Sequence, residues 1–125
     1  MYATCEGSAR YASRFPGSRG VAFYRSVLDL TVSSLGLGTC LGETDDTTDT
    51  FYTDAIVAAG EDGVNFFDIA IKYRNRSSGR CIGAALQRLQ RDHVVMCTKA
   101  GFLVAGAAKC LAPIDVSRRS AFHGS

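Results

Sequence analysis

Apolar runs and amphipathic segments alternate along the chain from residue 23 onward. The apolar-rich stretch 23–28, a tight break at Asp29 and Leu30 and a second stretch, 31–35, predict a β-hairpin. The second stretch continues into 35–39, a short apolar strand that ends in glycines. This part of the chain therefore indicates short strands ahead of the first long helix.

Two helices follow, and each leads into a short apolar run. Asp45, Asp46 and Thr47 can cap a helix that Gly63 would stop. The predicted inner face of this helix consists of residues that recur at helical spacing: Phe51, Tyr52, Ala55, Ile56 and Ala59. Ser78 can cap a second helix, whose inner face would be formed by Ile82, Ala85, Leu86 and Leu89. The runs 64–67 and 94–98 predict buried parallel strands.

The order hairpin, strand, helix, strand, helix, strand is typical of an α/β fold with a parallel sheet and right-handed crossovers. Residues 1–22 show no clear periodicity, and we interpret them as an N-terminal extension with room for a short helical piece. The pattern fades after Lys99, and 103–125 form a poorly patterned tail. The sequence thus predicts this extension and one domain, 23–125.

The composition is that of an ordinary globular chain. Its 125 residues are enough for one modest domain, and 46% of them are hydrophobic, which is too many for disorder. A net charge of +2 gives no electrostatic reason to expect nucleic acid or a membrane as a partner. No apolar run approaches the roughly 18 residues of a membrane span, and residues 1–19 lack the apolar core of a secretory signal.

The cysteines are odd in number and lack zinc-type spacing: Cys5, Cys40, Cys81, Cys97 and Cys110. Free, mostly buried thiols in a reducing cytosol are the favoured interpretation, and a disulfide framework is the alternative. The expected location is therefore cytoplasmic. His93 and His123 have no partner at a metal-ligand spacing, so the sequence predicts no metal site.

Three polar residues stand at or beyond the ends of the predicted strands. Asp68 follows 64–67, Lys99 follows 94–98, and Tyr73 lies in the polar stretch between them. Parallel α/β folds place their chemistry at this edge. A phenol is a poor acid at neutral pH because its unperturbed pKa is about 10, but a neighbouring ammonium stabilises the phenolate. Each residue alone fits a bland role as a cap or loop residue, whereas together they suggest that Tyr73, supported by Lys99 and Asp68, is a general acid.

Glycines within and just after the third predicted strand raise the question of a phosphate loop. Gly36, Gly38 and Gly42 have the spacing G-x-G-x-x-x-G, which is one residue too long for the dinucleotide-binding fingerprint. A tight strand exit is therefore the favoured interpretation. Thr39 can still offer backbone and hydroxyl contacts to a cofactor.

Taken as an ordered set, these segments resemble the N-terminal part of the aldo-keto reductase family. The resemblance covers roughly residues 23–103 and rests on VSSLGLGT at 32–39, GVNFFDIA at 63–70, Tyr73, Ser78 with IGAAL at 82–86, and TKAG at 98–101. It implies a partial (β/α)8 TIM barrel, namely the N-terminal hairpin and about the first three parallel strands with two intervening helices. It further implies NADP(H) bound without a Rossmann domain and a small-molecule carbonyl substrate.

The resemblance also implies roles for individual residues. The family uses a tetrad of Asp, Tyr, Lys and His, and its first three members fall on Asp68, Tyr73 and Lys99. Gly38, Thr39 and Asp68 are the predicted cofactor-binding residues. The chain departs from the family at Ile69, where Thr is usual, and at Gly79, where Glu is usual. It also shows no recognisable fourth strand to carry the histidine.

The histidines present do not fit the vacant place in the tetrad. His93 precedes the third parallel strand and should lie on the opposite face of the barrel, while His123 falls in the patternless tail. A complete barrel takes roughly 250 residues, so we expect an incomplete fragment, inactive by itself, that self-associates through open strand edges. The alternative is a non-catalytic small α/β fragment that binds a nucleotide or a partner.

Overall fold

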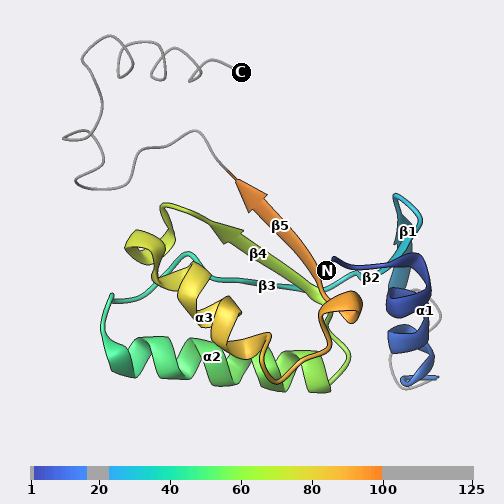
Figure 1. Cartoon of the computed structure of the whole chain (residues 1–125), viewed down its shortest axis with the longest axis horizontal. Helices are drawn as coiled ribbons and strands as arrows, with labels where there is room; N and C mark the ends of the chain where they lie inside the picture. Colours follow the sequence, from blue (N-terminus) through green and yellow to red (C-terminus); the bar gives the residue numbers. More distant parts are fainter. Residues whose placement is uncertain (1, 17–22, 100–125) are drawn as a thin grey trace, which may run out of the picture.

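A parallel sheet of three strands organises the chain (Figure 1). The computed structural model describes residues 2–16 and 23–99. The strands are β3 (Gly36–Gly38), β4 (Phe66–Ala70) and β5 (Val95–Lys99), in the order β3-β4-β5. The helix α2 (Asp46–Glu61) connects β3 to β4, and α3 (Ser77–Ala85) lies between β4 and β5. The predicted α/β class and element order are confirmed, and a (β/α)8 barrel stays a prediction.

The predicted hairpin is present at the end of the sheet where the parallel strands begin (Figure 1). It consists of the antiparallel strands β1 (Tyr24–Val27) and β2 (Leu30–Ser33). Leu28 and Asp29 form its turn with φ of 48° and 65°, which is the left-handed geometry of two-residue hairpin turns. The turn therefore lies one residue earlier than the predicted break, which consists of Asp29 and Leu30.

The first 22 residues include a helix that packs on the hairpin. Thr4 caps α1 (Cys5–Ser13) by accepting a hydrogen bond from the Gly7 N–H. The Tyr11 hydroxyl donates to the Gly60 carbonyl at 2.6 Å, and the Ser8 hydroxyl accepts from the Thr31 N–H at 3.0 Å. Helix α1 is therefore tied to α2 and to β2.

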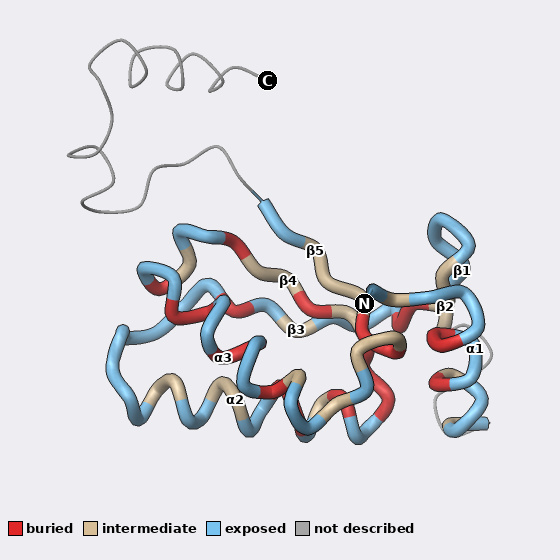
Figure 2. Tube along the Cα trace, viewed as in Figure 1, coloured by how far each residue is buried: buried red, intermediate tan, exposed pale blue. Residues whose placement is uncertain are grey.

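The core lies between the sheet and the two helices that cover one of its faces (Figure 2). Its buried members come from both helices, from β4 and from the residue just before β5: Ile56, Val57, Phe67, Cys81, Ile82, Ala85 and Val94. The predicted inner face of α2 is wrong at Phe51, which is 69% exposed, and at Ala55. The buried stripe is instead turned towards Val57 and Gly60.

Gly60 lies on this buried face of α2. A Cβ at this position would lie 2.8 Å from the Leu89 Cδ1 atom, so the Leu89 side chain would have to shift to admit it. The Gly60 carbonyl also receives the Tyr11 hydroxyl. The buried face of α2 thus contains a residue without a side chain, which a pattern of apolar side chains does not reveal.

The strand bounds differ from the predicted 64–67 and 94–98. Strand β4 begins at Phe66, since the main-chain N–H of Asn65 donates to the Ser33 hydroxyl instead of to the main chain of a neighbouring strand, and it extends to Ala70 because Ile69 and Ala70 pair with β5. Asp68 therefore lies inside β4 rather than beyond its end. Since side chains alternate along a strand, Asp68 faces away from the helix side that Phe67 and Ile69 occupy.

Asn65 joins the hairpin to the sheet through a buried side chain. Its Oδ1 accepts from the Ser33 N–H at 2.8 Å, and its Nδ2 donates to the carbonyls of Thr31 at 2.9 Å and His93 at 3.2 Å. Asn65 is fully buried. Because the amide satisfies one donor and two acceptors, it fixes the hairpin against the start of β4 and β5.

The cysteines correct another expectation. Cys5, Cys40, Cys81 and Cys97 are free, but only Cys81 is buried, so the prediction of mostly buried thiols is wrong. Cys110 lies outside the described residues. Helices in the described part of the chain are too short or too polar to cross a membrane.

Candidate active site

Asp68, Tyr73 and Lys99 come together at the carboxyl edge of the sheet. Asp68 pairs with Cys97 in the parallel register, and Lys99 is the last residue of β5. Paired residues share a face of a sheet, so Asp68 and Lys99 project from the face away from the helices. Tyr73 opens η1 (Tyr73–Arg76), a short 3-10 turn directly after β4.

The three polar groups form one hydrogen-bonded cluster. The Lys99 Nζ donates to the Tyr73 hydroxyl at 3.0 Å and also to the Asp68 Oδ1. The Tyr73 hydroxyl donates to the Asp68 Oδ2 at 3.3 Å. The Lys99 Nζ also lies 4.9 Å from the centre of the Tyr73 ring. The juxtaposition expected from the sequence is therefore present.

The electrostatics of the cluster favour a charged lysine. The carboxylate of Asp68, and secondly the hydroxyl of Tyr73, raise the pKa of Lys99 above its usual range. The side chains of Lys99 and Asp68 are 47% and 31% exposed, so the pair lies at the surface of the described structure. A permanent ammonium beside a phenol oxygen stabilises negative charge on that oxygen.

The predicted cofactor residues lie beside Asp68 on β3. Gly38 pairs with Asp68, and a Cβ at Gly38 would have no atom within 4 Å. Thr39 is fully buried, and its hydroxyl donates to the Asp68 carbonyl at 2.9 Å. Open space next to Gly38 thus adjoins a strand end that Thr39 holds in place.

Ser78 has a different role from the predicted helix cap. Helix α3 begins at Ser77 after Arg76, which has a left-handed backbone and no capping side-chain bond. The Ser78 hydroxyl instead donates to the Thr39 carbonyl at 2.5 Å. Ser78 therefore ties α3 to the end of β3, next to the cluster.

A strained segment follows Tyr73. Arg74, Asn75 and Arg76 have φ of 47°, 47° and 76°, a left-handed run without glycine. A residue in this conformation costs about 1–2 kcal/mol of backbone free energy, so other contacts must hold the segment.

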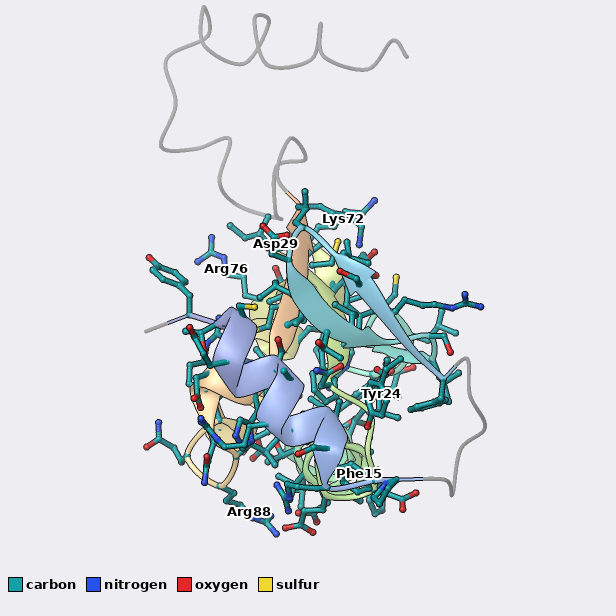
Figure 3. All side chains as sticks on the ribbon, turned by 90° about the vertical axis from the view of Figure 1, so that its right-hand side faces the viewer. Phe15, Tyr24, Asp29, Lys72, Arg76 and Arg88 are labelled. Atoms are coloured by element: carbon teal, nitrogen blue, oxygen red, sulfur yellow. The ribbon has the colours of Figure 1, made fainter. Side chains whose placement is uncertain are left out.

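The strained segment lies far from the outer end of α1. Figure 3 shows Lys72 and Arg76 at one end of the molecule, with Phe15 and Arg88 at the other.

Sequence reasoning missed Arg74. An arginine in a polar stretch is normally a solvated residue, yet its side chain is fully buried. The Arg74 guanidinium bonds to Glu43 and Asp49, which precede it by 31 and 25 residues. The only local signal is a polar run after a buried strand that contains no glycine to supply a turn.

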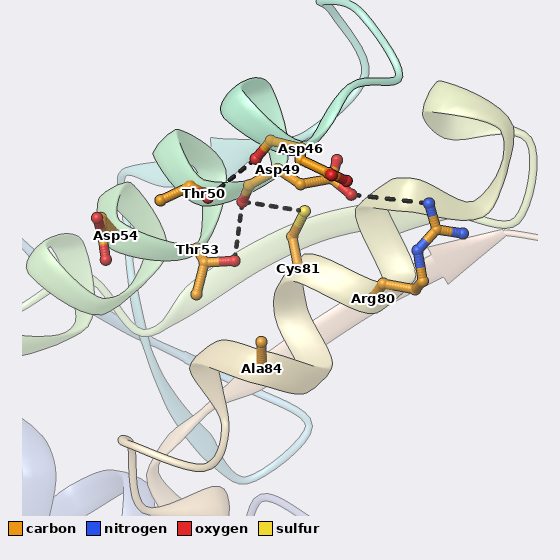
Figure 4. Close-up of a pocket in the computed structure, with 8 residues that line it drawn as sticks. All are labelled: Asp46, Asp49, Thr50, Thr53, Asp54, Arg80, Cys81 and Ala84. Atoms are coloured by element: carbon orange, nitrogen blue, oxygen red, sulfur yellow. Dashed lines mark hydrogen bonds and ion pairs between the residues drawn. The ribbon is translucent and has the colours of Figure 1, made fainter.

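The cavities formed by the described residues include two that lie away from the cluster. One, of about 400 Å³, lies between α2 and α3 (Figure 4) and is lined by Asp46, Asp49, Thr50, Thr53, Asp54, Arg80, Cys81 and Ala84. The other, of about 210 Å³, lies near the start of β5 and includes Tyr11 and His93 in its lining. Neither cavity is lined by Asp68, Tyr73 or Lys99.

His93 lies where the sequence places it, in η2 (Arg91–His93) before β5 and so at the opposite end of that strand from Lys99. It is 5% exposed, and its Nε2 has no hydrogen-bond partner among residues 2–16 and 23–99. Burial lowers the pKa of His93 below its ordinary value. His123 lies outside the described residues, which contain no cluster of metal-ligating side chains able to hold an ion.

A carboxylate, a phenol and an ammonium thus form one hydrogen-bonded cluster at the strand ends of a parallel α/β protein. Residues 34–120, more than half of the chain, match the sequence profile of the Aldo/keto reductase family. The chain therefore belongs to the aldo/keto reductase family, and the resemblance seen in the sequence is confirmed. Members of this family are oxidoreductases that act on small carbonyl compounds with NAD(P)H. No curated protein matches the chain significantly.

Proposed function

We propose that this chain supplies the proton-donating residues for the NADPH-dependent reduction of an aldehyde or ketone, or for the reverse oxidation. The observation that carries the proposal is the cluster of Asp68, Tyr73 and Lys99 at the carboxyl edge of β4 and β5. The family match supports the reaction type. The preference for NADPH and the carbonyl substrate are part of this proposal.

Tyr73 acts as the general acid. NADPH, if held beside Gly38 and Asp68, would supply the hydride to the carbonyl carbon, so that the electron pair of the former C=O π bond would remain on oxygen. The Tyr73 O–H turns from Asp68 towards that oxygen and gives up its proton, so the product is an alcohol. The Lys99 ammonium, 3.0 Å from the phenol oxygen, stabilises the phenolate that remains. Asp68 keeps Lys99 in place, and solvent returns a proton to the phenolate.

The residues beside the cluster fit a flat cofactor ring. Gly38 leaves open space where a side chain would stand, next to its register partner Asp68. We assign Gly38 and Asp68 to direct contact with the cofactor. Thr39 supports them from within, because its hydroxyl is bonded to the Asp68 carbonyl and its own carbonyl to Ser78.

The test is a chimaera in which residues 34–99 replace the matching segment of an active aldo/keto reductase. The chimaera should oxidise NADPH with an aldehyde, and Tyr73→Phe should lower the rate by about 100-fold or more. Tyr52→Phe is the matched control, since its hydroxyl bonds to the Leu41 carbonyl outside the cluster. A folded chimaera whose rate is unaffected by Tyr73→Phe would contradict the assignment.

A further inference from the structure

The left-handed segment after Tyr73 is held by the side chain of its own first residue. Arg74 directly follows the phenol, and its backbone has φ 47° and ψ 41°. The next residue, Asn75, has φ 47°, and its N–H donates to the Lys72 carbonyl at 3.2 Å. A second backbone bond runs from the Ser77 N–H to the Arg74 carbonyl. These short-range bonds do not account for an unusual conformation at successive residues, which persists only where the surroundings determine it.

The Arg74 guanidinium holds the segment in this conformation through hydrogen bonds from all three of its nitrogens. Nε and Nη2 donate to the Glu43 carbonyl at 2.9 and 2.7 Å, and Nη2 donates to the Asp49 Oδ1 at 2.5 Å. Nη1 donates to the Cys81 Sγ at 3.6 Å. The guanidinium carbon lies 4.5 Å from the centre of the Tyr52 ring.

These partners belong to other elements of the fold. Glu43 lies between β3 and α2, Asp49 and Tyr52 are on α2, and Cys81 is a core residue of α3. A buried charge is costly unless paired and hydrogen-bonded, and here the pairing with Asp49 and the bonds to oxygen and sulfur meet that condition. The side chain therefore connects the turn after β4 to both helices.

We propose that Arg74 is a positioning residue that locks the segment 74–76 and thereby keeps the Tyr73 hydroxyl against Lys99 and Asp68. The inference rests on the proposed role of Tyr73 as proton donor. A phenol at the start of a strained turn needs such a lock, because relaxation of Arg74 to a common backbone conformation redirects the residue before it. An error of 1 Å in the position of a catalytic group can reduce a rate by roughly 100-fold.

The test compares variants of the 125-residue chain. Arg74→Gly removes the side chain but permits a positive φ at no steric cost, so it separates the lock from the backbone strain. Arg74→Lys keeps the charge but cannot reach the same partners together. Arg80→Ala is the matched control, since Arg80 also lies near Asp49, at 3.6 Å, but its side chain is 65% exposed.

Nuclear magnetic resonance measures the contact itself. In the parent chain, nuclear Overhauser contacts between the Tyr73 ring and the Lys99 methylenes, and an upfield ring-current shift of the latter, are expected. Both should be lost in Arg74→Gly and weakened in Arg74→Lys, while Arg80→Ala retains them. Hydrogen–deuterium exchange of the peptide covering 72–76 should be at least about tenfold faster in Arg74→Gly.

Each outcome decides the proposal. If Arg74→Gly and Arg74→Lys keep the Tyr73–Lys99 contact, or if the parent lacks it, Arg74 does not position the phenol, whatever happens to overall stability. That result would leave the reductase proposal to the chimaera experiment. Conversely, an inactive chimaera combined with a contact that depends on Arg74 would contradict the proposed reaction and preserve the positioning role.

Discussion

Replacing Asn65 should separate the hairpin from the sheet. In Asn65→Ala, the Ser33 N–H and the carbonyls of Thr31 and His93 lose their side-chain partner. A buried polar group left without a partner costs about 1–3 kcal/mol, so three fully buried groups would together cost roughly 3–9 kcal/mol. The bond to the Thr31 carbonyl is only partly buried, so we expect roughly 3–6 kcal/mol, and less if water enters the gap. Domains of this size are stable by only about 5–15 kcal/mol, so the variant should lose a large part of its stability.

Urea unfolding followed by far-ultraviolet circular dichroism measures this loss. With a slope of about 1–3 kcal/mol per molar urea, the midpoint should fall by roughly 2 M. Gln87→Ala, at an exposed residue after α3, is the control and should shift the midpoint little. A loss below about 1 kcal/mol, or one equal to that of the control, would refute the reasoning.

Asn65→Asp tests the direction of the hydrogen bonds. The carboxylate can still accept from the Ser33 N–H, but it would face the Thr31 and His93 carbonyl oxygens instead of donating to them. Burial raises the pKa of such a carboxyl, so the variant should become more stable relative to Asn65→Ala as the pH falls from 7 to 5. Comparing the two variants cancels any other group that titrates in this range. Parallel pH curves would show that the amide does not donate here.

Three further predictions concern helix packing, pH and the cofactor. Gly7→Ala should destabilise the chain by about 1–3 kcal/mol, because the new Cβ would lie 2.5 Å from the Asp92 carbonyl oxygen. Gly83→Ala should stabilise it by about 0.5–1 kcal/mol, because no described atom lies within 4 Å of the new Cβ. Urea midpoints that shift in the same direction for both variants would contradict this contrast. Burial holds the pKa of His93 below its ordinary value of 6.5, so the unfolded state binds the proton first and stability should fall as the pH drops below that value; His93→Gln should flatten the dependence, and a parent equally stable at pH 7.5 and 5 would exclude it. Calorimetric titration of the 125-residue chain should show weak or undetectable NADPH binding, because the family resemblance places the adenosine phosphate on later βα loops; low-micromolar affinity would mean that the cofactor site is misplaced.

The positions of Asp68 and Lys99 at one edge of the sheet could be predicted from the sequence, because the apolar runs locate the two strands that carry them. Apolar runs fix where β4 and β5 lie, and parallel strands bring their carboxyl ends to one edge of the sheet. The strand bounds moved by a few residues, yet the register still places Lys99 two positions beyond the partner of Asp68. Errors in the bounds of an element therefore do not disturb a site that depends only on which edge the residues share.

Residues whose role depends on distant main-chain groups could not be predicted. Asn65 is defined by carbonyls of the hairpin and of His93, and Arg74 by the Glu43 carbonyl and Asp49. When a side chain bonds to a main-chain carbonyl, the residue type of its partner gives no signal in the sequence, because every residue carries the same carbonyl. Gly60 was missed for a related reason: Leu89 packs into the space that a side chain at this position would fill, and the sequence pattern does not show that contact.

The cluster depends on one supersecondary unit rather than on the whole barrel. Asp68 on β4, Tyr73 on the turn after it, and Lys99 on β5 are joined through neighbouring strands, and Arg74 anchors the turn to α2 and α3 within the same unit. Proton donation can therefore be organised by strand, turn, helix and strand alone. Exclusion of water and recognition of the carbonyl compound need further residues to cover the site, because the side chains of Lys99 and Asp68 are 47% and 31% exposed here. The two parts of the proposed catalysis are thus separable, and the chimaera tests the first of them with the covering residues supplied by another member of the family.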